Sequence, residues 1–289
     1  MKRREQRRLI FTFLAPPLAV YFIVVILPAL SAFRYSLWQW DGLSEPVSVG
    51  LANFKRLLQP GSDLWPALQH NAILMFAPGL FILILALFFA YSIHQRVMGA
   101  RLFRIAFFFP NIISAVAIAV LWTLIYSTSG FGLLNNLLRL DPPVPFAGSD
   151  TLIMAIVPMI VWTATGFYMV LFLASMESIP ESFYEAARLD GAGQFALFRK
   201  ITLPLMWDVL TTGIVFLIIG GLKVFDVVWV MDNGRPTAKT HTMATLMYSR
   251  VFEQYNIGQG AAVAVTLFLL VLAATLISLR LMRRERLEY

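Results

Sequence analysis

The sequence predicts an all-α integral membrane protein with six transmembrane helices. Apolar residues make up 59% of the 289 residues, charged residues only 13%, and the mean hydropathy is +0.74. A soluble domain carries roughly 25% charged residues, so much of this chain is expected to be solvated by lipid. Continuous apolar runs argue against a membrane barrel, whose strands alternate apolar and polar residues.

Six segments reach the ~20 mainly apolar residues that a membrane-spanning helix needs. They are 9–33, 71–94, 105–126, 152–175, 209–231 and 260–279. A cytoplasmic tail, 1–8, precedes one transmembrane domain, 9–289. The first apolar run is longer than the ~7–15 residues of a secretory signal, so we expect a retained helix. Prolines within the spans are compatible with helices, because neighbouring helices can re-satisfy the freed backbone groups.

The distribution of basic residues predicts the orientation. Fifteen Lys and Arg residues belong to the two termini and to the second and fourth connections, seven belong to the other three connections, and Lys223 lies inside the fifth span. Cytoplasmic segments carry the excess of positive charge. Both termini and the fourth connection, 177–207, are therefore expected in the cytoplasm. The net charge of +7 does not indicate nucleic-acid binding, because the basic residues flank the spans.

The fourth connection contains the most polar stretch of the chain, EAARLDGAGQFALFRKITLP at 185–204. Pro180 suits the first turn of a helix. Gly191 and Gly193 are expected to supply the chain reversal after such a helix, because glycine accepts left-handed backbone at little cost. We expect a second helix at 194–201, with Pro204 marking its end. An ordinary solvated loop with some helix is the alternative interpretation.

The spacing within this stretch resembles the EAA loop of permease subunits of binding-protein-dependent ABC importers. The pattern is Glu-Ala-Ala, three residues, Gly, nine residues, Ile, one residue, Leu-Pro. It is filled by Glu185, Ala186, Ala187, Gly191, Ile201, Leu203 and Pro204. In that family the loop sits in a cleft of the cytoplasmic ATPase subunit and couples ATP-driven closure to the membrane helices. The resemblance implies a type I ABC importer permease fold, and an ATPase-coupling surface made of these residues with Asp190.

Other segments are similar to the carbohydrate branch of the family, the maltose and glycerol-phosphate type. They are Ser36–Gly42, Val49–Phe54, Phe225-Asp226, Thr245-Leu246, Tyr248, Phe252, Gly258, Ala261 and Ala262. The segment 231–236 departs from the branch, which often has Thr and Gly-Gly-Pro where this chain has one Gly and an Arg before Pro236. The resemblance implies a sugar or related solute: an oligosaccharide, monosaccharide, polyol or glycerol phosphate. A non-sugar solute stays open, and so does the identity of the sugar.

The resemblance also implies the assembly. A cytoplasmic ABC ATPase dimer would bind ATP and Mg, so this chain needs no cofactor of its own. A second, related permease would complete a heterodimer, and an extracytoplasmic solute-binding protein would deliver the solute. The location is then the prokaryotic cytoplasmic (inner) membrane, which the chain crosses several times. The identities of the partner permease and ATPase stay open.

Polar side chains within the spans are candidates for the substrate path, because a solute site needs a few placed polar groups in an apolar, aromatic-lined pocket. They are Asn111, Ser114, Trp162, Thr163, Thr165, Tyr168, Lys223, Asp226 and Trp229. Ser and Thr in membrane helices can equally join helices to each other. Lys223 and Asp226 are three residues apart, so on one helix they share a face and can pair. A structural ion pair, or snorkelling of the side chains near the outer interface, is the alternative to a role in translocation.

The sequence argues against catalysis. No Gly-rich run ends in Gly-Lys-Ser/Thr, so a nucleotide site in this chain is not expected. The chain has no cysteine and three scattered histidines, and Asp226 is the only clear carboxylate within a span. An intramembrane enzyme needs a nucleophile with a base, paired aspartates or a metal motif, and is much less favoured. A membrane anchor is a third possibility, but it does not require the EAA spacing.

Overall fold

Helices form nearly all of the regular structure. The computed structural model describes residues 3–95 and 99–283. Across these residues the strands amount to one antiparallel hairpin, β1 (Trp38–Gln39) with β2 (Val47–Ser48). The predicted helical membrane protein is confirmed apart from that hairpin. Four of the basic residues that were counted to predict the orientation lie outside the described residues: Lys2, Arg96, Arg284 and Arg286.

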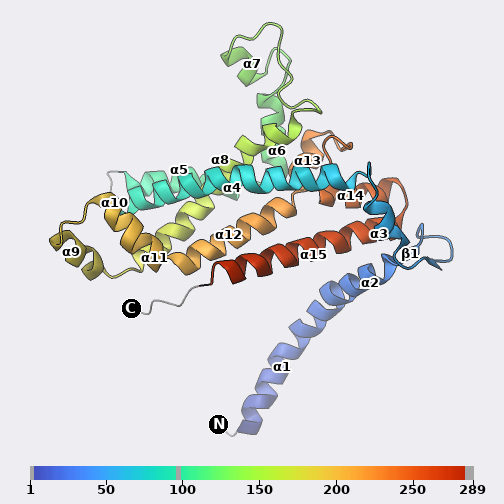
Figure 1. The fold of residues 1–289 in the computed structure, drawn as a ribbon, viewed down its shortest axis with the longest axis horizontal. Helices are drawn as coiled ribbons and strands as arrows, with labels where there is room; N and C mark the ends of the chain where they lie inside the picture. Colours follow the sequence, from blue (N-terminus) through green and yellow to red (C-terminus); the bar gives the residue numbers. More distant parts are fainter. Residues whose placement is uncertain (1–2, 96–98, 284–289) are drawn as a thin grey trace. The chain divides into compact units, whose positions relative to one another are not determined.

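The chain divides into two compact units, residues 1–64 with 246–268, and residues 65–245 with 269–289. Figure 1 labels their elements. Before residue 64 the helices are α1 (Arg3–Tyr21), η1 (Phe22–Ile26, a π-helical turn), α2 (Leu27–Tyr35) and α3 (Ala52–Leu57). The later elements are α4 (Leu64–His94), α5 (Ala100–Ile112), α6 (Ala115–Ile125), α7 (Leu133–Leu137), α8 (Leu152–Glu177), α9 (Glu181–Leu189), α10 (Gln194–Leu197), η2 (Phe198–Thr202), α11 (Leu203–Leu205), α12 (Trp207–Leu222), α13 (Asp226–Met231), α14 (Met243–Tyr248), η3 (Ser249–Glu253) and α15 (Ile257–Leu281).

Five helical stretches are long and apolar enough to cross a membrane. They are Ile10–Tyr35, Leu64–His94, Leu152–Glu177, Trp207–Met231 and Ile257–Leu281. Each overlaps one of the predicted spans. In the stretch near the N-terminus, none of the 18 most apolar consecutive residues is buried. In α8, half of the corresponding 18 residues are buried. The fold of this chain therefore places α8 in a protein interior and leaves the first span for lipid or partners.

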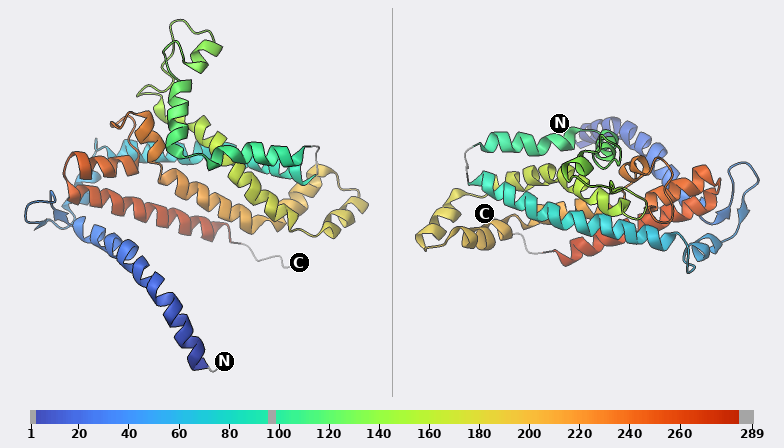
Figure 2. Two further views of the ribbon diagram at one scale, coloured as in Figure 1. Left: turned by 180° about the vertical axis from the view of Figure 1, so that it is seen from behind. Right: turned by 90° about the horizontal axis from the view of Figure 1, so that it is seen from above.

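The third expected span, 105–126, is not one straight helix. It consists of α5, which begins earlier at Ala100, and α6, and the two are bent by 97°. Pro110 removes a backbone donor near the end of α5. Ile113 and Ser114 then take extended backbone with ψ of 142° and 136°. α5 consequently runs alongside α8, while α6 takes a different direction from α5 (Figures 1 and 2) and packs on α13 and on the first part of α8.

Glycines allow two close helix contacts in the second unit. A Cβ on Gly221 of α12 would lie 2.5 Å from the Cα of Met75 in α4. A Cβ on Gly166 of α8 would lie 1.9 Å from the backbone oxygen of Phe107 in α5. Real Cβ atoms do not approach other atoms so closely, so both helix pairs depend on the missing side chain. Small residues at membrane helix interfaces allow this approach of backbones.

The fifth span is broken near its C-terminal end. α12 ends at Leu222, residues 223–225 are not helical, and α13 begins at Asp226. Lys223 and Asp226 therefore do not share a helix face, and no salt bridge joins them within residues 3–95 and 99–283. The interpretation as a structural ion pair is wrong. Lys223 instead lies at the C-terminal end of α12 and Asp226 at the N-terminal end of α13. A positive charge at a helix C-terminus and a negative charge at a helix N-terminus are each stabilised by the helix dipole.

The first unit is held by one buried amide. Asn53 of α3 is 1% exposed, and its Nδ2 donates to the backbone oxygens of Ser36 at 2.9 Å and Trp38 at 2.8 Å. On the next strand position, the backbone oxygen of Trp40 accepts from the N–H of Ile257, at 3.0 Å. The hairpin is thereby fixed to α3 and to the first turn of α15.

Gly221→Ala is expected to destabilise the protein, because the new methyl group meets the backbone of α4. Overpacking of this kind costs about 1–3 kcal/mol, and the thermal unfolding midpoint of the purified protein should fall. Gly220→Ala is the matched control, since nothing lies within 4 Å of its added Cβ. Equal midpoints for the two variants would contradict the close contact of α4 and α12.

Candidate functional site

A helical hook (residues 181–205, from α9 to α11) lies between the fourth and fifth spans. α9 ends in a Schellman motif: Gly191 has φ of +80°, its N–H bonds to the oxygen of Arg188, and the N–H of Ala192 bonds to the oxygen of Ala187. Glycine takes this left-handed position without steric cost, and the motif satisfies carbonyls at the helix end. The expected left-handed backbone is confirmed at Gly191, but not at Gly193, which is extended with φ of −75°.

The hook has its own small core. Tyr184 is 1% exposed and packs with Ile179 and Leu197. The Tyr184 hydroxyl lies 3.1 Å from Oγ1 of Thr202, so a hydrogen bond joins α9 to η2 within this core. This packing makes the two arms of the hook one body, so the interpretation as an ordinary solvated loop is wrong. Tyr184 and Thr202 were not among the predicted site residues.

The hook is also fixed to the C-terminal end of α4. The Tyr91 hydroxyl donates to the backbone oxygen of Gln194 at 3.0 Å. The rings of Tyr91 and Phe198 lie 4.9 Å apart, and those of His94 and Tyr184 5.4 Å apart. The hook is therefore in direct contact with α4.

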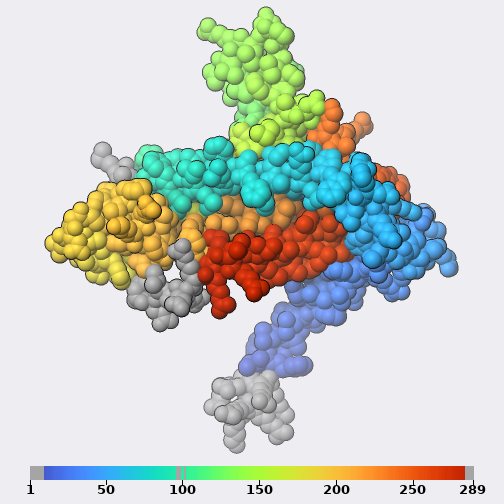
Figure 3. All heavy atoms as spheres, in the orientation of Figure 1, coloured from blue at the N-terminus to red at the C-terminus, as the bar shows by residue number. Residues whose placement is uncertain are grey.

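One face of the hook is exposed. Glu185, Ala186, Asp190 and Gly191 are solvent-accessible, and Leu189 is 90% exposed. Figure 3 shows the hook, coloured yellow to gold, uncovered on the face in view. An apolar side chain with this exposure beside two carboxylates is suited to contact with another macromolecule.

The remaining predicted hook residues have a supporting position. Ala187 is partly buried against the Tyr184 core, so the two alanines of the motif face different ways. Ile201, Leu203 and Pro204 are half-buried. Pro204 does not end the second arm, because it stands in the first turn of α11, where its missing N–H is tolerated. The backbone leaves helical geometry only at Met206.

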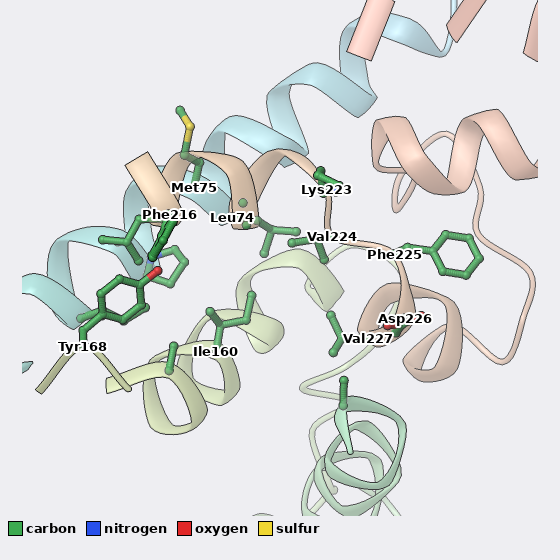
Figure 4. Close-up of a pocket in the computed structure, with 18 residues that line it drawn as sticks. Leu74, Met75, Ile160, Tyr168, Phe216, Lys223, Val224, Phe225, Asp226 and Val227 are labelled. Atoms are coloured by element: carbon green, nitrogen blue, oxygen red, sulfur yellow. The ribbon is translucent and has the colours of Figure 1, made fainter. Parts of the chain in front are cut away.

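A cavity of about 270 Å³ lies beside the break in the fifth span. Its walls come from α4, α6, α8, α12 and the residues that connect α12 to α13. Three predicted substrate-path residues line it: Tyr168, Lys223 and Asp226. Figure 4 shows Tyr168 and Ile160 on α8 facing the chain that carries Lys223 to Val227. The lining is largely apolar with a few polar groups, as in solute sites generally.

One buried side chain satisfies the backbone groups that the break exposes. Asn71 of α4 is fully buried, and its Nδ2 donates to the oxygens of Gly221 at 2.9 Å and Leu222 at 3.1 Å. Its Oδ1 accepts from the N–H of Met243 at 2.8 Å. Helix ends leave carbonyls and N–H groups without intrahelical partners, and in a membrane each such group is costly. We call this arrangement the Asn71 clamp.

A threonine completes the clamp. Oγ1 of Thr242 donates to the oxygen of Val224, within the break, at 2.7 Å. Thr242 also stands before α14 and shares reciprocal contacts with Thr245, at 2.9 Å and 3.4 Å, like a capping box. Neither Asn71 nor Thr242 was predicted as a site residue. A buried Asn in an otherwise apolar span is the signal that could have indicated the first of them.

The other predicted substrate-path residues lie outside the cavity lining. The hydroxyls of Thr163 and Thr165 donate to carbonyls of their own helix. Asn111 and Ser114 are exposed at the bend between α5 and α6. Trp229 stacks on Phe225, with ring centroids 5.5 Å apart, and Trp162 lies 6.3 Å from Trp122. The structure therefore brings together three of the nine candidates.

The atypical segment 231–236 forms a tight turn. Asn233 and Gly234 have φ of 55° and 70°, and the N–H of Gly234 bonds to the oxygen of Trp229 at 2.7 Å. Burial raises the pKa of Asp232. The Thr240 hydroxyl donates a hydrogen bond to the Asp232 carboxylate, and this bond partly offsets the rise in pKa. This turn ends α13, and the chain then returns to Thr242 of the clamp. It forms with one glycine, where Gly-Gly-Pro was the expected pattern.

Residues 82–286 match the family described as "Binding-protein-dependent transport system inner membrane component". The match includes the hook, the broken fifth span and most of the cavity. A Thermococcus litoralis trehalose/maltose transport system permease protein is 32% identical over 99% of this chain and 97% of its own length. A Streptomyces coelicolor diacetylchitobiose uptake system permease protein is 34% identical over 92% of this chain and 81% of its own length.

Among solved structures, a bacterial ABC transporter involved in the import of the acidic polysaccharide alginate contains a similar chain. The TM-score is 0.83 at 21% identity, with 97% of this chain and 96% of that chain covered. The two chains share one fold, and the expected type I ABC importer permease fold is confirmed. 

Asn71→Leu is expected to lower the free energy of unfolding by about 1–3 kcal/mol, because it leaves buried backbone groups unsatisfied. The measurement is the thermal midpoint of the purified protein. Thr163→Val is the matched control, since that hydroxyl bonds only to carbonyls of its own helix, those of Met159 and Ile160. If Asn71→Leu were as stable as Thr163→Val, the clamp would not hold the break.

Proposed function

The chain belongs to the family of binding-protein-dependent transport system inner membrane components, and we propose that within it the chain is the permease subunit of an ATP-driven ABC importer of a sugar or related solute. It is a multi-pass protein of the inner membrane. The observation that carries the proposal is the family match over 82–286, which covers both the hook and the broken span beside the cavity.

The hook is the proposed contact with the ATPase. Its exposed residues Glu185, Ala186, Asp190 and Gly191, with Leu189 between them, would enter a cleft of the cytoplasmic subunit. Ala187, Ile201, Leu203 and Pro204 would support that surface from beneath, as their partial burial favours. Because Tyr91 and Phe198 join the hook to α4, closure of the ATPases would move α4 and change the shape of the cavity that α4 helps to line.

The proposed assembly contains two cytoplasmic ATPases, which bind ATP and Mg, a second related permease, and an extracytoplasmic solute-binding protein. Both termini and the hook then face the cytoplasm, as the distribution of Lys and Arg favours. Without partners, the chain exposes an apolar surface of α5 and α6 that includes Phe109, Ile112 and Val120. This surface would contact the second permease or lipid. This chain itself would catalyse no reaction.

The solute is proposed to be a sugar because the similar permeases are named for trehalose/maltose and diacetylchitobiose. Tyr168, Lys223 and Asp226 would be the polar groups of its path. A non-sugar solute is the alternative. A panel of sugars, polyols and glycerol phosphates, screened by thermal shift on the partner binding protein, would distinguish them.

Reconstitution tests the function as a whole. The chain should co-purify with an ATPase and a second permease. In proteoliposomes, ATP hydrolysis should rise when the sugar-loaded binding protein is added outside. Absence of any ATPase partner would overturn the proposal, and hydrolysis that responds only to a non-sugar solute would select the alternative.

Glu185→Lys and Gly191→Asp are expected to leave membrane insertion intact and to lower transport by about tenfold or more. A tenfold loss corresponds to ~1.4 kcal/mol of coupling free energy, somewhat less than the ~2 kcal/mol or more of an interface hot spot. Uptake of labelled sugar, normalised to the amount of protein in the membrane, is the measurement.

Controls separate lost coupling from lost folding. Gly191→Asn keeps a residue that tolerates positive φ and should be affected less than Gly191→Asp. Gly193→Asp adds the same charge nearby at a position with φ of −75° and no atom within 4 Å of its Cβ. Normal uptake by well-expressed Glu185→Lys would count against the coupling role of the hook.

A further inference from the structure

A second pocket, of about 340 Å³, lies in the first unit, between the β-hairpin and the turn that precedes α15. Its lining is polar and aromatic, and includes Trp40, Asp41, Glu45, Gln254, Tyr255 and Asn256. None of these residues belongs to the membrane cavity or to the hook, and the transport function proposed above does not use them. All lie in connections that the charge distribution places outside the cytoplasm.

The hairpin wall is preformed. Oδ1 of Asp41 accepts from the N–H of Leu43, the N–H of Ser44 and the Ser44 hydroxyl, at 2.7–2.9 Å. The indole N–H of Trp40 donates to the oxygen of Ser44 at 2.8 Å. These bonds from Ser44 and Leu43 lower the pKa of Asp41 to about 2, so its carboxylate is charged at neutral pH. The wall therefore needs little ordering before it binds a ligand.

The opposite wall has a strained backbone and an oriented amide. Tyr255 has φ of 50°, rare for an aromatic residue, and its side chain is 68% exposed. Oε1 of Gln254 accepts from Nη1 of Arg250 at 2.6 Å, and Arg250 is paired with Asp63 at 2.6 Å. Similarly, Oδ1 of Asn256 accepts from the N–H of Gln259. The two amides are thus oriented with their NH₂ groups left as donors.

We propose that this pocket is an extracytoplasmic binding site for a neutral or amino-substituted saccharide. The rings of Trp40 and Tyr255 offer apolar faces for the C–H surface of a sugar, the carboxylates of Asp41 and Glu45 accept hydrogen bonds from its hydroxyls, and the oriented amides donate. No Lys or Arg is among its lining residues, which are all described. Two carboxylates without a cation repel an acidic sugar, so uronates are expected to bind more weakly.

This proposal rests on the proposed function, because it assumes a sugar importer with this pocket on the outer side. The site would hold solute close to the permease before or after its transfer from the binding protein. Open to solvent and small, it should bind in the millimolar range, which is about −4 kcal/mol at 1 mM. Such weak binding suits a site that must release its ligand during each transport cycle.

The experiment uses the assembled transporter in nanodiscs, without the binding protein. Three trisaccharides are titrated by saturation-transfer NMR and calorimetry: a neutral glucose trimer, a cationic glucosamine trimer and an anionic galacturonate trimer. The neutral and cationic trimers should bind, and the anionic trimer should bind at least about fivefold more weakly, which is ~1 kcal/mol.

Variants then locate the binding. Glu45→Gln removes an acceptor charge, and Tyr255→Asn removes a ring while keeping a residue that tolerates positive φ. Each should weaken binding at least about fivefold, and Glu45→Gln should also reduce the discrimination against the galacturonate trimer. Glu253→Gln is the control for the first, because Glu253 is exposed next to Gln254 and does not line the pocket. Phe252→Leu is the control for the second.

Three results would overturn the proposal. They are no saccharide binding at tens of millimolar, saccharide binding that neither pocket variant changes, and variants that weaken only the binding of the solute-binding protein. The last result would mean that the pocket holds a protein side chain. Uptake in proteoliposomes separates this inference from the proposed function. If sugar is transported although the pocket binds none, only the pocket site fails, whereas if no sugar is transported, the proposed function fails.

Discussion

The broken fifth span depends on Asn71, and the cavity depends on the broken span. A helix that stops in the membrane exposes carbonyls with no water to satisfy them. Asn71 binds two of these carbonyls and the N–H of Met243, and Thr242 binds the oxygen of Val224. With those groups satisfied, residues 223–225 can line a cavity as irregular backbone. Gly221 adds to this arrangement, since its missing side chain brings α12 against α4, the helix that carries Asn71.

The same helix, α4, connects the clamp with the hook. Its 31 residues extend about 46 Å at the usual rise of 1.5 Å per residue. Asn71 lies in its first third, Pro78 lines the cavity near its middle, and Tyr91 holds Gln194 near its C-terminal end. One helix therefore contacts both the hook and the break, with no chain of intermediate side chains between them.

The sequence could predict what depends on length, composition and local spacing. Apolar run lengths predicted the helical spans, and Gly191 predicted the turn of the hook, because those features depend on near neighbours. It could not predict the 97° bend within the third span, since Pro110 alone is tolerated in membrane helices and the close approach of Phe107 to Gly166, which packs α5 on α8, is a tertiary contact. The pairing of Lys223 with Asp226 was inferred from a spacing of three, which applies only if the helix continues.

The division of the EAA motif into two faces is also a tertiary effect. Ala186 and Ala187 are chemically identical neighbours, and only the packing of Tyr184 on Leu197 decides which one is covered. The small size of Ala187 lets the second arm approach α9, while that of Ala186 leaves an unobstructed surface beside Glu185 and Leu189. A larger residue would therefore act differently at the two positions: at Ala187 it would separate the arms of the hook, and at Ala186 it would obstruct a partner without disturbing the hook. In this chain the first alanine of the pair is exposed and the second makes an internal contact, on adjacent residues.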